Sequence, residues 1–116
     1  MPPAQLPSFL PSTTVAALEK LIDGPRDGAL LRFGLGREYL KSGDTARAIA
    51  MLRSAVARDP AYSAAWKILG KTLTETGQHD EARETLQQGI TVAESRGDIQ
   101  AAKEMKVFLR RLDRAQ

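Results

Sequence analysis

Side chains able to catalyse a reaction or hold a metal ion are few in this chain of 116 residues. It contains no cysteine and a single histidine, which excludes thiolate zinc sites, iron–sulfur clusters, disulfides and histidine-rich metal sites. That histidine, His79, stands at a predicted helix start, where we interpret it as a surface turn residue. The nearby carboxylates of Asp80, Glu81 and Glu84 would favour the positive end of the same helix dipole. We therefore expect no catalytic residue, no metal and no cofactor.

Two short motifs resemble known signatures but fit structural roles better. Gly34-Leu35-Gly36 resembles the start of a dinucleotide fingerprint, but no glycine follows at position 39 and no strand is expected before it. Arg96-Gly97-Asp98 spells a tripeptide known from cell adhesion. We interpret it as a helix break in which Asp98 caps the next helix. Neither motif predicts a ligand.

Composition places the chain among ordinary soluble domains. Its residues are 42% hydrophobic and 27% charged, which is too apolar for a disordered chain, and its length fits one domain. No apolar run approaches the roughly 20 residues that cross a bilayer, so no membrane span is expected. The first basic residue is Lys20, so no charged segment precedes a signal sequence, and we expect a cytoplasmic protein.

The net charge of +3 arises at the end of the chain. Residues 96–116 hold six basic and three acidic side chains, whereas residues 1–95 are balanced. This excess is weaker than the basic stripe of proteins that bind phosphate backbones, so nucleic acid is not the expected partner.

The sequence pattern repeats with a period of 34 residues over most of the chain. The matching pairs are Leu35 and Leu69, Gly36 and Gly70, Arg37 and Lys71, Gly43 and Gly77, Ala48 and Ala82, Leu52 and Leu86, and Val56 and Ile90. Each copy splits at a glycine, which predicts helices over 29–42 and 45–58 and again over 63–76 and 79–93. Because only two or three residues separate the helices of a pair, each pair is expected to fold into an antiparallel hairpin.

Two glycines recur inside the predicted helices. Gly36 and Gly70 each cost about 1 kcal/mol relative to alanine in such a position, so a compensating gain is expected. We predict that the two helices of a hairpin approach closely there, with a small alanine, Ala48 or Ala82, at the crossing. Leu52 and Leu86 would then fill the seam beside Tyr39 and Leu73.

Further segments flank the repeats. Residues 1–12 contain four prolines and predict an extended arm. A short helix is expected over 13–23, capped by Ser12 or Thr13, and a last helix over 98–114. The predicted apolar faces of these two helices are Val15, Leu18, Leu21 and Ile22, and Ile99, Ala102, Met105, Phe108, Leu109 and Leu112. Both helices would cover the open ends of the stack.

The motifs of the two copies resemble those of tetratricopeptide repeats. The second copy shows Trp66-x2-Leu69-Gly70-x2-Leu73 followed by Ala82-x3-Leu86, and the first shows Leu35-Gly36-x2-Tyr39 followed by Ala48-x3-Leu52, Ala55 and Asp59-Pro60. The departures are Arg32 in place of the first tryptophan, Leu73 in place of tyrosine, Gly89 in place of a small alanine, and Glu94 in place of proline. Without that proline, the second hairpin is expected to continue to about Ser95.

The resemblance implies an all-α fold in which antiparallel helical hairpins stack into a short superhelix. It divides the chain into the arm at 1–12 and a single domain at 13–116. The domain comprises a helix at 13–24, repeats at 29–62 and 63–96, and a capping helix at 97–116. Trp66 is expected in the core between the hairpins.

The resemblance further implies a non-enzymatic scaffold that binds another protein, with no small-molecule substrate. In stacked hairpins the first helix of each unit lines the concave surface. The residues expected to face this groove are Leu30, Phe33, Arg37, Lys41, Ala64, Lys67, Lys71 and Glu75. The basic residues would bind an acidic peptide or helix, while Leu30 and Phe33 offer an apolar anchor. The opposing interpretation is that these cations are merely solvated.

Particular residues bear on other kinds of partner. The chain has no asparagine, and chaperone-binding relatives use asparagines to clamp a C-terminal carboxylate, so a chaperone terminus is not expected. An alternative is that Leu6, Phe9 and Leu10 of the arm occupy the groove of the same or a neighbouring molecule, as a monomer or a weak homo-oligomer. A further alternative is that the last helix contacts nucleic acid or an acidic membrane through Lys103, Lys106, Arg110, Arg111 and Arg114.

Overall fold

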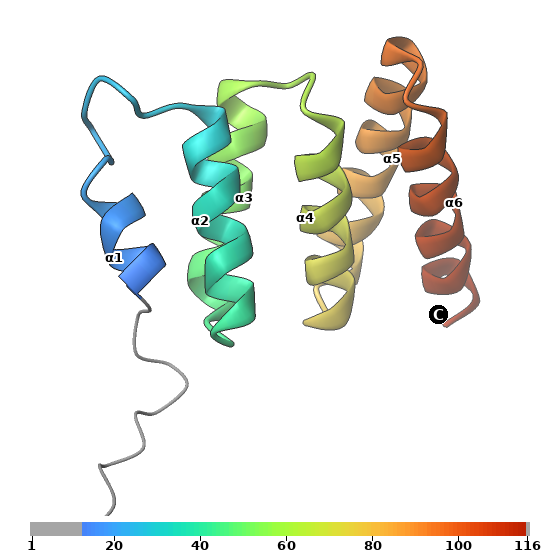
Figure 1. Ribbon diagram of the computed structural model, residues 1–116. Coiled ribbons are helices and arrows are strands. Elements are labelled where there is room, and N and C mark those ends of the chain that lie inside the picture. The colour runs from blue at the N-terminus through green and yellow to red at the C-terminus, as the bar shows by residue number, and fades with distance from the viewer. Residues whose placement is uncertain (1–12, 116) are drawn as a thin grey trace, which may run out of the picture.

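Helices follow one another throughout residues 13–115, the part of the chain that this computed structural model describes. They are α1 (Thr13–Glu19), α2 (Ala29–Lys41), α3 (Thr45–Arg58), α4 (Ser63–Glu75), α5 (His79–Arg96) and α6 (Ile99–Arg114). The α2–α3 and α4–α5 pairs form antiparallel hairpins that stand side by side, and α6 packs beside them at the far end (Figure 1). The expected all-α repeat fold is confirmed, whereas the proline-rich arm at 1–12 lies outside the described residues.

The ends of α2, α4 and α5 share one local geometry. Each is followed by a glycine with positive φ, at 81° for Gly43, 79° for Gly77 and 75° for Gly97. The amide after each glycine donates to a carbonyl five residues back, as Asp44 N does to Tyr39 O at 2.9 Å. Asp44 then caps α3 by accepting from the Arg47 amide, and Asp98 caps α6 in the same way. Short turns of this kind reverse the chain and fix each hairpin.

The recurring glycines mark the closest approach within each hairpin. A β-carbon at Gly36 would lie 2.8 Å from Leu52 Cγ, and one at Gly70 would lie 2.5 Å from Leu86 Cδ2. The predicted close approach is present, but the side chain that lies against each glycine is a leucine of the returning helix instead of an alanine. Ala48 contributes its carbonyl oxygen, 3.4 Å from the same point at Gly36.

The flanking helices pack somewhat differently from expectation. Helix α1 ends at Glu19, short of the predicted position 23, and a turn with Asp23 at φ 65° follows. Helix α5 continues to Arg96, as the missing proline suggests. On α6, Ile99 is 56% exposed and so does not belong to the buried face, whereas Ala101 is buried there.

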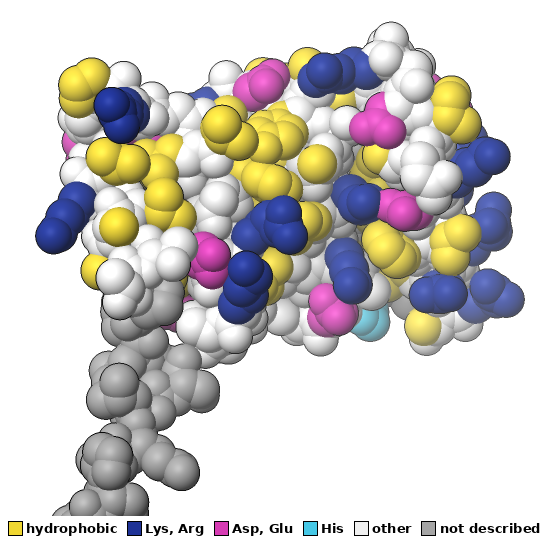
Figure 2. All heavy atoms as spheres, in the orientation of Figure 1, with side chains coloured by type: hydrophobic (Ala, Val, Ile, Leu, Met, Phe, Trp, Pro, Cys, Tyr) yellow, Lys and Arg dark blue, Asp and Glu magenta, His cyan; other side chains and the backbone are white. Residues whose placement is uncertain are grey.

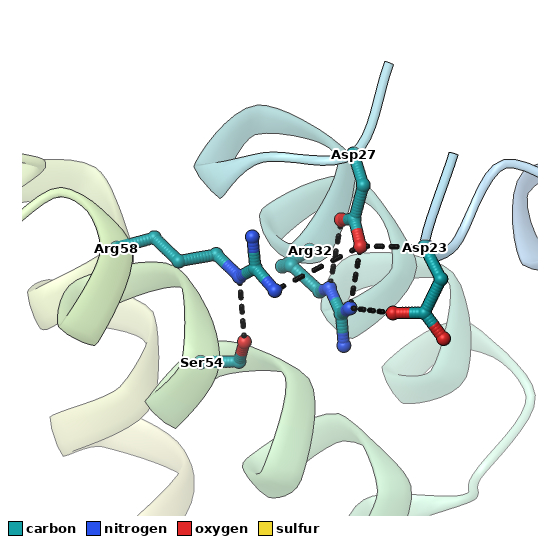
Figure 3. A network of polar contacts seen from close by, with 5 residues as sticks. All are labelled: Asp23, Asp27, Arg32, Ser54 and Arg58. Carbon is teal, nitrogen blue, oxygen red and sulfur yellow. Dashed lines mark hydrogen bonds and ion pairs between the residues drawn. The ribbon is translucent and has the colours of Figure 1, made fainter. Parts of the chain in front are cut away.

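An ion-pair network replaces the missing tryptophan of the first repeat (Figure 3). Arg32 donates to Asp27 through Nε at 2.9 Å and Nη2 at 2.6 Å, while the Asp23 amide donates to the same carboxylate at 2.9 Å. The hydrogen bond from Arg32 holds the pKa of the Asp27 carboxyl well below its ordinary value. Arg58 of α3 approaches the same carboxylate at 3.8 Å. The network ties the chain before α2 to the first hairpin.

Trp66 makes the corresponding link in the second repeat. The residue is 8% exposed, and its Nε1 donates to the Pro60 carbonyl at 2.8 Å. Arg32 and Trp66 lie 34 positions apart and both bind the chain that precedes their own helix. The two repeats thus use an ion pair and an indole for one structural purpose.

Candidate functional site

The first helices of the hairpins and α6 form one face of the molecule, the α2–α4–α6 face, which is turned toward the viewer in Figure 2. Hydrophobic side chains are interleaved there with basic and acidic ones (Figure 2). The residues predicted for the groove that are exposed are Leu30, Arg37, Lys41, Lys71 and Glu75, and those that are partly buried are Phe33, Ala64 and Lys67. Leu30 is the most exposed of the large apolar side chains within residues 13–115, at 75%.

An aromatic pair occupies the junction of α2 and α4. The rings of Phe33 and Tyr62 have centroids 4.8 Å apart, and the Arg37 guanidinium lies 5.8 Å from the Phe33 centroid. Burial raises the pKa of the Tyr62 hydroxyl. Sequence reasoning missed Tyr62, although its place directly before α4 could have drawn attention to it. Phe33, Tyr62 and Arg37 thus form one cluster, the aromatic platform, about one helical turn from exposed Leu30.

A shallow hollow of about 480 Å³ continues from this platform toward the α5–α6 turn. It is lined by Asp59, Tyr62, Ser63, Ala64, Arg96, Gly97 and Asp98. Ser63 donates its hydroxyl to Asp98 at 2.7 Å, which holds the pKa of that carboxyl below its ordinary value. Arg96 donates to the Ala61 carbonyl at 2.5 Å. Asp98 and Arg96 therefore already serve the turn between helices.

Lys67 is engaged within the protein. Its Nζ donates to Glu104 of α6 at 2.5 Å, and Gln100 donates to the other oxygen of that carboxylate at 3.3 Å. The bond from Lys67 holds the pKa of Glu104 below its ordinary value. The sequence placed Lys67 in the groove as a cation for a ligand, whereas the structure gives it an internal partner 37 residues away.

Two other cations predicted to line the groove, Lys41 and Lys71, differ in whether they have an acidic partner within the protein. Lys41 lies 3.5 Å from Glu38, one turn earlier in α2. Lys71 has no ion pair within 4 Å among residues 13–115, and it lines a hollow of about 180 Å³ with Thr74, Glu75, Phe108 and Arg111. The structure therefore brings Lys71 together with α6 residues instead of with Phe33 and Leu30.

Helix α6 takes the place of the first helix of a third unit. Ala65 and Leu69 of α4 correspond to Ala101 and Met105 at an offset of 36, and all four side chains are buried. Because α5 is longer than α3, the spacing departs from 34, and the 34-residue comparison did not reveal the correspondence. Comparison of the sequence with itself at an offset of 36 would have predicted that α6 lies beside α4, as α4 lies beside α2.

The basic side chains of α6 differ in their contacts. Lys106 pairs with Glu94 at 2.9 Å, and Arg111 lines the hollow beside Lys71. Lys103, Arg110 and Arg114 are exposed. Of the five cations expected to contact an acidic surface, Lys106 is therefore already engaged by a carboxylate of α5.

Side chains suited to holding a metal ion do not cluster within the described residues. His79 begins α5, and no group of three or more histidine or carboxylate side chains within residues 13–115 is placed to hold a metal ion. None of the described helices has the length and apolar character needed to span a lipid bilayer.

Comparisons with known proteins agree with this geometry. The tetratricopeptide repeat model matches residues 39–105. A TPR repeat-containing protein of Pseudomonas aeruginosa is 50% identical over 101 residues, covering 87% of this chain and 96% of that protein. The solution structure of a Bordetella parapertussis protein is similar with a TM-score of 0.76, 43% identity and 90% of each chain covered. The crystal structure of a Salinibacter ruber tetratricopeptide repeat domain protein has a TM-score of 0.73 and 28% identity, covering 78% of this chain and all of that one.

Proposed function

The chain belongs to the tetratricopeptide repeat family, and from this premise we propose that it is a non-enzymatic module that binds a peptide or helix of a partner protein on the α2–α4–α6 face. The family fold serves protein–protein interaction in general.

One observation carries the proposal. The α2–α4–α6 face combines exposed apolar side chains with cations that the described residues leave without an anionic partner. Leu30 is 75% exposed and precedes Phe33 by about one turn of α2, and Arg37 and Lys71 have no ion pair within 4 Å among residues 13–115. A partner segment would bury the apolar groups and neutralise the cations, and both effects favour binding.

Fixed side chains support recognition on this face. The Phe33 ring is partly buried and lies against both the Tyr62 ring and the Arg37 guanidinium, so these contacts restrict its conformational freedom before a ligand binds. Rigid aromatic side chains are common anchors in protein interfaces. The acidic ligand expected from the sequence remains the best match, with Arg37 and Lys71 as the contacts and Lys67 excluded because it binds Glu104.

The test is a double charge reversal, Arg37→Glu with Lys71→Glu, followed by titration with a pool of acidic, leucine-containing peptides. Lys67 stays unchanged because its reversal would set two carboxylates against each other at Glu104. The matched control reverses Lys103 and Arg110, which are exposed on α6. We expect the first variant to lose peptide binding with unchanged helicity by circular dichroism, and the control to bind normally. Equal binding by all three proteins would contradict the proposal.

A further inference from the structure

The groove between α4 and α6 has an apolar floor. Two hollows lie there, one of about 180 Å³ and one of about 460 Å³, and both are lined by Lys71 and Phe108. Ile68 of α4 lines the larger hollow. Phe108 and Ile68 are partly buried and pack against the main core, so their positions are fixed from beneath. The two hollows are therefore parts of one groove, which we call the α4–α6 groove.

The rim of the smaller hollow carries an excess of positive charge. Lys71 and Arg111 are exposed, line the same hollow and have no ion pair within 4 Å among residues 13–115. Lys67 and Glu104 neutralise each other along the wall. Glu75 is the acid at this rim, and it forms no ion pair with either cation in the described structure. Figure 2 shows hydrophobic side chains between basic ones over α4 and α6.

The dimensions of the smaller hollow favour a side chain over a free small molecule. Sites for drug-sized ligands occupy roughly 300–1,000 Å³ and enclose most of the ligand. The smaller hollow, of about 180 Å³, lies below that range, whereas the larger one, of about 460 Å³, lies within it, but both are open to solvent and so do not enclose a ligand. The smaller hollow suits one large apolar side chain that is presented by a longer segment.

We propose that the α4–α6 groove reads an acidic–apolar element in the partner: one large apolar side chain packs on Phe108, and a neighbouring carboxylate is bound jointly by Lys71 and Arg111. The inference rests on the proposed function and adds the chemistry of the ligand at one defined position. An aspartate or glutamate beside a leucine, methionine or aromatic residue meets both requirements. A lysine or arginine in the place of the acid is repelled.

Arg111 is the residue that gives this recognition its geometry. Its planar guanidinium can donate two parallel hydrogen bonds to one carboxylate, whereas Lys71 acts as a point charge. The carboxylate of Glu75 repels the carboxylate of the bound segment and so lowers its affinity. It also disfavours segments that would place their carboxylate next to Glu75.

The experiment selects peptides from a displayed library of random 12-residue sequences on the full-length protein. Recovered peptides are synthesised, and their affinities are measured by isothermal titration calorimetry. We expect the sequences to share an acid within a few positions of a large apolar residue. Replacing that acid by its amide in the peptide should weaken binding about tenfold, equivalent to about 1.4 kcal/mol.

Variants of the protein locate the interaction. Lys71→Gln with Arg111→Gln should weaken binding about tenfold or more, since two charged contacts are lost. The control, Lys103→Gln with Arg110→Gln, removes the same charge from exposed positions of α6 and should leave affinity unchanged. Glu75→Gln should strengthen binding about twofold because it removes a repulsive charge. These substitutions are all at exposed positions, so they test the inference without the folding risk of Phe108→Ala.

The outcomes separate this inference from the proposed function. Peptides that shift amide resonances of α2 and α4 but bind the Lys71–Arg111 variant as tightly as the unmodified protein would overturn the inference alone. So would selected sequences without an acidic residue. Peptides that shift no resonance of α2, α4 or α6, or a selection that recovers no binding peptide, would overturn both.

Discussion

The close contact between Gly70 and Leu86 makes a quantitative prediction about alanine at two glycines. Both Gly34 and Gly70 lie inside helices, where alanine is favoured over glycine by about 1 kcal/mol. A β-carbon at Gly34 meets nothing within 4 Å, whereas one at Gly70 would lie 2.5 and 2.8 Å from Leu86 Cδ2 and Cγ. Leu86 is fully buried and cannot swing away. Gly34→Ala should therefore stabilise the protein and Gly70→Ala should destabilise it.

The magnitude follows from two opposing contributions. Overpacking a core by one methyl group costs about 1–3 kcal/mol. Subtracting the helix preference of about 1 kcal/mol leaves Gly70→Ala destabilised by about 1 kcal/mol at the middle of that range. Gly34→Ala gains about 1 kcal/mol, so the free energies of unfolding of the two variants should differ by about 2 kcal/mol.

Urea denaturation followed by circular dichroism measures both variants against the unmodified protein. A Leu86→Ala background supplies the control, because it removes the atoms that the new methyl group would meet. In that background Gly70→Ala should become stabilising, as double-mutant cycles reveal for residues in contact. If Gly70→Ala stabilises the protein as much as Gly34→Ala does, the close approach of α4 and α5 is not what retains the glycine, and the reasoning is refuted.

Three further predictions concern the contacts that anchor the helices. Asp27→Asn should lower the free energy of unfolding at pH 5. Because the pKa of Asp27 is lowered in the folded protein, its stabilisation is complete above the ordinary value of 3.8, and the difference between variant and unmodified protein should shrink as the pH falls below 4. A constant difference between pH 5 and 2 would argue against the Arg32 pair. Burial and the hydrogen bond to Glu19 raise the pKa of Tyr39 to about 12. The unmodified protein should therefore lose stability between pH 10 and 12 more steeply than Tyr39→Phe. Parallel pH profiles of the free energy of unfolding would count against that contact. Trp66→Phe should lower the free energy of unfolding in urea by about 2 kcal/mol, since it leaves the Pro60 carbonyl without its donor and opens a void. A loss below about 0.5 kcal/mol would contradict the role given to the indole.

Local features of the chain were predictable because they depend on neighbouring residues. The glycine that ends α2 and the aspartate that begins α3 specify a turn on their own, so Gly43 and Asp44 located the first hairpin well. The 34-residue period predicted the second hairpin by the same logic. The family assignment followed from motifs that such spacing keeps in register, and it is confirmed.

Contacts between distant segments were not predictable in the same way. The pairing of Lys67 with Glu104 needs α6 beside α4, which the sequence suggests only at an offset of 36. The bond of Arg32 to Asp27 depends on how the chain after α1 folds back, and no periodic pattern encodes that path. The α4–α6 groove was missed for this reason, because Phe108 was assigned to the covered face of a cap and Arg111 to an alternative contact with nucleic acid or an acidic membrane.

Placing a bound segment on the molecule tests the central claim most directly. The measurement is a proton–nitrogen NMR titration of the labelled full-length protein with a 12-residue peptide from the library selection. The account predicts shifts confined to α2, α4 and α6, above all around Phe33, Lys71 and Phe108. Shifts confined to α3 and α5, or none at millimolar peptide, would contradict the claim that the α2–α4–α6 face binds a partner.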